Sequence, residues 1–316
     1  MGSMALGLFA SLIIGLIVKT FGEKLHINFL VEAGSLAMDK NVVGAAIGVA
    51  VAYGLQAPPL VLFSSAITGA AGYLLGGPAG SFVSAVIGTE IGKVVNKETP
   101  VDIIVTPVVT ILVGFAAAGT VGPVISSGMK QLGSLIEWAT ELQPIPMGIL
   151  VAVVMGLALT APISSAALAI MMELSGLAAG AATVGCAAQM VGFAVISYRE
   201  NRIGGLLAQG LGTSMLQIPN IVKNPWILLP PTLAGAAIGP LATKVFEMEN
   251  IHLGAGMGTA GLVGQFTTVT AMGFSGSVIS KIILLHFIAP AIIALVAAVY
   301  MRRLGLIKDG DMKLDL

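Results

Sequence analysis

Long runs without a charged side chain constrain this sequence more than any other feature. Eight runs contain no Asp, Glu, Lys or Arg: 41–89, 103–129, 142–172, 174–198, 203–222, 224–243, 253–280 and 282–301. A helix that crosses a bilayer needs about 20 mostly apolar residues. The first run is long enough for two crossings, and residues 1–18 add one more. We therefore expect an all-α, polytopic integral membrane protein with about ten hydrophobic segments.

The composition excludes several classes of function. Charged residues make up 9% of the chain, whereas a soluble domain carries roughly a quarter. Fifteen basic and fifteen acidic residues cancel, so no basic face is available for nucleic acid. The single cysteine, Cys186, excludes disulfides and cysteine-ligated metal sites, and we expect it to be a small buried hydrophobe. We expect no cofactor and no enzymatic activity, because no catalytic grouping of side chains is present.

The chain is expected to form one membrane domain over residues 1–316, with residues 1–3 a candidate cloning remnant. The basic cluster Arg302, Arg303 and Lys308 follows the last apolar run. The positive-inside rule places such a cluster in the cytoplasm. We therefore expect residues 302–316 to be a cytoplasmic tail that frays. Residues 130–141 read as a separate amphipathic surface helix.

Three glycine-rich segments are candidates for broken backbone: 203–222, 254–264 and 76–80. Irregular backbone survives at membrane depth only where protein buries it or where it lines a wet cavity. We expect one or two of these segments to be re-entrant loops. Short motifs also recur, such as Ser64-Ser65-Ala66 and Ser164-Ser165-Ala166. This recurrence is a hint of an internal repeat, which is common in transporters.

The pattern Gly-x-x-small-Gln, in which 'small' is Ala or Gly, occurs three times and ends at Gln189, Gln209 and Gln265. An amide in hydrocarbon needs hydrogen-bond partners. The partner is either a neighbouring helix or a polar, uncharged solute such as a sugar, and the sequence leaves both alternatives open. The hypothetical solute-binding set comprises Ser164, Ser165, Gln189, Gln209, Asn220, Thr259 and Gln265.

Two ionisable residues are candidates for an ion pathway. Glu173 would line such a pathway if it were buried, but it would simply be solvated in a short turn before Gly176. His252 lies just before the glycine cluster at 254–264. His286, on an apolar segment, reads more readily as a hydrogen-bonded packing residue than as a proton carrier.

At this point three stretches suggest a family: PISSAALA at 162–169, LSGLAAGAATVGCAAQ at 174–189 and GGLLAQGLGTSMLQIPN at 204–220. They resemble the stand-alone IIC-like membrane proteins grouped with the phosphotransferase-system sugar permeases, including a branch described as regulators of toxin genes. The resemblance implies a sugar-translocating homodimer with re-entrant loops in the bacterial cytoplasmic membrane.

The same resemblance implies separate IIA and IIB proteins, because no domain here offers a phospho-histidine or phospho-cysteine. The glucose-type motif Gly-Ile-Thr-Glu is absent, and Gly258-Thr259-Ala260-Gly261 stands in the glycine-rich segment instead. The leading expectation is a permease-like protein that binds and moves a small polar solute within membrane lipids. The alternatives are a solute sensor or regulator without transport, and an ion-coupled carrier or channel.

Overall fold

The computed structural model describes residues 2–161 and 165–314. The chain divides into two compact units, Met1–Leu132 and Gly133–Leu316. Both are helical, and the described residues contain no named strand, only an isolated bridge between Gly176 and Asn250. The predicted all-α class is therefore confirmed.

The number of membrane spans is smaller than the sequence predicted. Six helices are long and apolar enough to cross a bilayer, or up to seven if one bent pair of helices is counted as a span. The predicted count of about ten is not confirmed, because the apolar runs 203–222 and 253–280 are divided into short helices. The helix that follows the turn at Gln143 has only 17 residues. The qualifying helices span Leu6–Glu23, Pro59–Val95, Asp102–Leu142, Gly176–Ile196, Pro225–Val245 and Gly276–Arg303, and the bent pair joins Asn28–Ala37 to Lys40–Gly54.

The first unit is a set of helices with a seam of small residues. Its helices are α1 (Gly2–Leu8), α2 (Ile14–Leu25), α3 (Asn28–Ala37), α4 (Lys40–Gly54), α5 (Pro59–Val95) and the first part of α6 (Asp102–Leu142). A Cβ on Gly48 of α4 would lie 2.1 Å from the carbonyl oxygen of Ser65 on α5. Glycine at this position therefore lets the two backbones touch, as small residues do between membrane helices.

The glycine-rich segment 76–80 interrupts α5. Gly77 has a φ of +61°, and Pro78 follows it directly. Glycine adopts this left-handed conformation without the steric cost that a side chain would bring. The predicted backbone break is present here, although the helix resumes on its far side.

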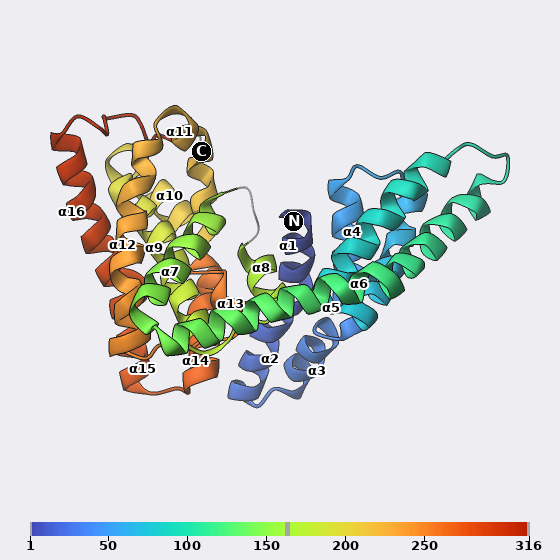
Figure 1. Ribbon diagram of the computed structural model, residues 1–316, viewed down its shortest axis with the longest axis horizontal. Coiled ribbons are helices and arrows are strands. Elements are labelled where there is room, and N and C mark those ends of the chain that lie inside the picture. The colour runs from blue at the N-terminus through green and yellow to red at the C-terminus, as the bar shows by residue number, and fades with distance from the viewer. Residues whose placement is uncertain (1, 162–164, 315–316) are drawn as a thin grey trace. The chain divides into compact units, whose positions relative to one another are not determined.

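The second unit surrounds one central helix. Its helices are α7 (Pro144–Thr160), α8 (Ser165–Met171), α9 (Gly176–Ile196), α10 (Tyr198–Leu207), α11 (Ile218–Lys223), α12 (Leu229–Pro240), α13 (His252–Ala255), α14 (Val263–Met272), α15 (Gly276–Ile282) and α16 (Ala289–Arg303). Helices α7, α12 and α16 lie side by side around α9 (Figure 1). The apolar window of α9 is 94% buried inside the protein.

Small side chains explain why α9 can occupy the centre. A Cβ on Gly185 would lie 2.0 Å from the carbonyl oxygen of Ala152 on α7. A Cβ on Gly180 would lie 1.8 Å from the carbonyl oxygen of Met248. Neighbouring backbones therefore pack so closely against α9 at these two positions that any side chain larger than that of glycine would clash.

Two predictions about surface segments are corrected. Residues 130–141 are not a separate helix, because α6 continues without interruption to Leu142. The described part of the tail, residues 304–314, packs against the protein, because Ile307 is 2% exposed and Met312 is fully buried. The side chains of Glu200, Asn201, Gln217 and Asn220 hold the tail by binding its backbone.

Candidate functional site

The first broken segment lies between α10 and α11. A π-turn covers Ala208–Gly212, and a 3-10 turn covers Ser214–Gln217. Thr213 between them is extended, and its hydroxyl accepts a hydrogen bond from the backbone N–H of Met215 at 3.1 Å. This segment is the strongest of the predicted backbone breaks, and its re-entrant course stays a prediction.

The second broken segment runs from α13 to α14. Gly258 and Gly261 have φ values of +54° and +53°. A Cβ on Gly258 would lie 2.6 Å from the carbonyl carbon of Cys186 on α9. Glycine is required at Gly258 for two reasons, the left-handed conformation and the close approach to α9.

The two broken segments meet at Thr259. Its hydroxyl donates to the carbonyl oxygen of Gly210 at 2.5 Å and lies 3.5 Å from the sulfur of Met190 on α9. Thr259 is completely buried. A residue of the predicted solute-binding set thus joins both irregular segments to the central helix.

Gln189 lies at the centre of a second polar group. Its side-chain oxygen accepts from Thr160 of α7 at 3.2 Å, and its Nε2 donates to Thr232 of α12 at 2.9 Å. The hydroxyls of Thr160 and Ser214 are 2.8 Å apart. The amide therefore connects three helices to the first broken segment, and only 1% of Gln189 is exposed.

Ser165 and Gln265 lie next to the second broken segment. The hydroxyl of Ser165 donates to the carbonyl oxygen of Gly256 at 2.6 Å. Ser164, its predicted companion, lies outside the described residues. Gln265 lies on α14, three residues after the end of the 3-10 turn Ala260–Leu262.

Gln265 has a buried polar atom that is not used in a hydrogen bond within the described residues. Its Nε2 lies 2.9 Å from Nδ1 of His286, which is itself buried. The buried Oε1 has no hydrogen-bond partner among the described residues. The oxygen and nitrogen of an amide are told apart only by their hydrogen-bond partners. Whichever way the Gln265 amide is turned, only one of its two polar atoms bonds His286, and the other is buried without a partner among the described residues. His286 has the hydrogen-bonded packing role that its apolar context suggested.

Gln209 and Asn220 belong to a different polar group. Gln209 donates to the hydroxyl of Ser197 and accepts from Gln217 at 2.8 Å. Asn220 donates to Gln217 at 2.9 Å and to the carbonyl oxygen of Lys313 at 2.9 Å. We call Gln209, Gln217 and Asn220 the amide ladder. Its bonds hold the tail, and the hydrogen bonds of Gln209 and Asn220 within the described residues go to other partners than Gln189, Thr259 and Gln265.

The tail is bound through its backbone. The carbonyl oxygen of Met312 accepts from Asn201 at 2.8 Å and from Gln217 at 3.0 Å. The N–H of Met312 donates to Glu200 at 2.8 Å. Glu200 also pairs with Arg302 at 3.2 Å. Gln217 was not among the site residues predicted from the sequence. Its position in the uncharged run 203–222 could have indicated it, because an amide in an apolar segment needs a hydrogen-bond partner.

Glu173 and His252 are brought close together. Glu173 occupies an exposed turn with a φ of +53°, so the solvated alternative is the one that the structure has. Burial lowers the pKa of His252, and the nearby Glu173 carboxylate opposes this by raising it. The backbone N–H of Asn250 donates to the carbonyl oxygen of Gly176 at 3.2 Å, which joins the two segments that carry these residues.

Apolar spans packed around buried amides and broken helices are characteristic of a polytopic membrane transport protein. Residues 1–314 match the family model described as Phosphotransferase system, EIIC. The chain belongs to this family, whose general role is that of the membrane sugar permease of the phosphotransferase system. EIIC domains are transport components, and partner IIA and IIB proteins carry out phosphorylation. No curated protein and no solved structure is similar to the chain at a significant level.

Proposed function

We propose that the second unit binds a sugar or sugar derivative and moves it across the bacterial cytoplasmic membrane, with the tail on the cytoplasmic side. The proposed binding residues are Ser165, Gln189, Thr259 and Gln265, with separate IIA and IIB proteins supplying the phosphoryl group. We further propose a homodimer, as the family resemblance implies. The observation that carries the proposal is the buried, unpartnered amide atom of Gln265.

The chemistry of these side chains suits an uncharged polyhydroxy solute. Amide and hydroxyl groups each donate and accept hydrogen bonds, so they match the hydroxyls of a sugar. The glycines at 254, 256, 258 and 264 let other parts of the protein pack directly against this segment, so a solute would reach its backbone only after these contacts open. No charged side chain belongs to this set, which favours a neutral solute over an ion.

Binding requires the internal hydrogen bonds to be exchanged. The amide of Gln189 is occupied by Thr160 and Thr232, and Thr259 is occupied by Gly210. A solute hydroxyl would replace these partners as the two broken segments separate. This exchange is the kind of local change that alternating access at a broken-helix site requires.

Binding is tested first with the detergent-purified protein and a panel of sugars in a thermal-shift assay. A ligand at 100 times its Kd stabilises the native state by about 2.7 kcal/mol. We then expect Gln265→Leu to weaken binding of the identified sugar by about tenfold, because the sugar loses one or two hydrogen bonds. Gln131→Leu, on an exposed part of α6, is the matched control. Equal affinity in Gln265→Leu and the control would contradict the assignment of Gln265 to the site.

Uptake in liposomes, with and without IIA and IIB proteins, separates a permease from a sensor. Binding without uptake under both conditions favours the regulatory alternative. The proximity of Glu173 and His252 favours a second candidate, an ion-coupled carrier. Its mark would be a pH-dependent flux that Glu173→Gln abolishes.

A further inference from the structure

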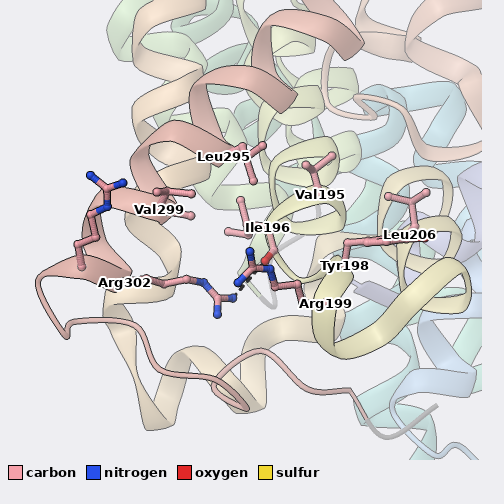
Figure 2. A pocket seen from close by; sticks show the side chains of 10 residues that line it. Val195, Ile196, Tyr198, Arg199, Leu206, Leu295, Val299 and Arg302 are labelled. Atoms are coloured by element: carbon pink, nitrogen blue, oxygen red, sulfur yellow. Dashed lines mark hydrogen bonds between the residues drawn. The ribbon is translucent and has the colours of Figure 1, made fainter.

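A pocket of about 550 Å³ lies where α9, α10 and α16 meet. Its upper wall in Figure 2 is apolar and includes Val195 and Leu295, while Arg199 and Arg302 lie at the lower end. The pocket is thus divided into an apolar part and a cationic part. It is separate from the proposed sugar-binding residues, none of which lines it.

The apolar part of the pocket is formed partly by α16, on a side of this helix that other parts of the protein leave uncovered. Leu295 is 45% exposed and Val299 is 43% exposed, and both lie on α16 within the span Gly276–Arg303. Exposed apolar side chains on a spanning helix contact lipid chains. The natural occupant of this part of the pocket is therefore an acyl chain.

The cationic part carries an excess of positive charge. Arg302 is engaged by Glu200 at 3.2 Å and by Asp309 at 2.5 Å. Arg199 and Arg303 also line the pocket and are exposed, and neither forms an ion pair within the described part of the chain. The pocket is thus lined by three arginines, of which only Arg302 is paired with carboxylates, those of Glu200 and Asp309. Guanidinium is well suited to phosphate, because its planar donors can bind two oxygens at once.

We propose that this pocket binds an anionic phospholipid, with the phosphate held by Arg199 and Arg303 and an acyl chain along α9 and α16. Basic residues at the end of a helix also interact favourably with the helix dipole. That interaction accounts for Arg302 and Arg303 at the end of α16, but not for Arg199 on α10 or for the adjoining apolar cavity. Basic pockets between membrane helices are a known form of headgroup recognition.

The test compares lipids on the delipidated, purified full-length protein. Native mass spectrometry measures binding of phosphatidylglycerol and of phosphatidylcholine with the same acyl chains. We expect phosphatidylglycerol to bind more tightly, and Arg199→Gln/Arg303→Gln to weaken it by about 25-fold, or about fivefold for each arginine. Arg302 is left unchanged because it holds Glu200. Arg202→Gln, an exposed arginine on α10 outside the pocket, is the control and should bind as the unmodified chain does.

The apolar part is tested by Val299→Trp, which fills the pocket without changing its charge. We expect this variant to weaken phosphatidylglycerol binding, and unchanged affinity would refute the placement of the acyl chain. The phosphate site is refuted if both lipids bind equally or if the double arginine variant binds like Arg202→Gln. If inorganic phosphate competes as strongly as phosphatidylglycerol binds, the pocket is a site for free anions and the lipid proposal fails.

Discussion

Replacing Gln217 by leucine removes the central member of the amide ladder. Gln217 is fully buried and makes three hydrogen bonds, to Gln209, Asn220 and the carbonyl oxygen of Met312. Met312 keeps its bond from Asn201, and Asn220 keeps its bond to the tail. The side-chain oxygen of Gln209, however, is left without a hydrogen-bond donor among the described residues.

The expected cost follows from these partners. A buried acceptor without a donor costs about 1–3 kcal/mol, and each lost hydrogen bond about 1 kcal/mol more. The bonds to Asn220 and Met312 add about 2 kcal/mol to the cost of the orphaned Gln209 oxygen, so we expect Gln217→Leu to lower the free energy of unfolding by about 3–5 kcal/mol. The amide of Met312 should also exchange with solvent faster, because one of the bonds that holds the tail is lost.

The assay is an SDS titration of the detergent-purified protein, followed by circular dichroism, with hydrogen exchange to monitor the tail. Gln131→Leu is the control and should change stability by less than about 0.5 kcal/mol. The double variant Gln209→Leu/Gln217→Leu removes the orphaned oxygen together with its donor. It should therefore be less destabilised than the sum of the single variants by about 1–2 kcal/mol. Strict additivity, or a Gln217→Leu variant as stable as the control, would refute the ladder as the element that holds the tail.

Three further predictions concern packing, pH and thiol chemistry. Gly185→Ala should cost about 3 kcal/mol in chemical unfolding, because its Cβ would lie 2.0 Å from the oxygen of Ala152, whereas Gly119→Ala, with no atom within 4 Å, should be neutral or stabilising. Burial lowers the pKa of His252, so its contribution to stability is present above its ordinary pKa of about 6.5 and is lost as pH falls below that value. The melting temperature should therefore fall less steeply on acidification in His252→Gln than in the unmodified chain, and parallel curves would contradict this. Cys186 is buried and should react with a maleimide only after unfolding, so rapid labelling of the native protein would exclude the packing around α9 described here.

The sequence predicted best those spans whose helical structure follows from their own apolar composition. The uncharged run 103–129 lies within α6, and the run 282–301 lies within the span Gly276–Arg303, which ends in α16. The predicted count of about ten segments is not confirmed, because an apolar run shows how much of the chain avoids water and not whether its backbone stays helical. At 203–222 and 253–280 the glycines, with Pro219 in the first run, interrupt the helix.

The hydrogen bonds of the buried amides were predictable only in part, for a similar reason. An amide in an apolar run must find a partner, and this need is visible from the sequence at Gln189, Gln209 and Gln265. Which partner it finds depends on residues far away in the chain. Gln189 pairs with Thr232, whereas the ladder that contains Gln209 pairs with Met312, which is 95 positions from Gln217. No local pattern distinguishes these two outcomes.

The enclosure of α9 has a consequence for how the protein is assembled in the membrane. Gly, Ala and other small side chains make up most of this helix, so it offers lipid little apolar surface of its own. Its stability comes from the close approach of α7, α12 and α16, and the last two of these follow it in the chain. During synthesis α9 therefore enters the bilayer before most of its neighbours exist. Its final position depends on the last third of the polypeptide, so truncations near the C-terminal end should destabilise the centre of the second unit rather than its edge.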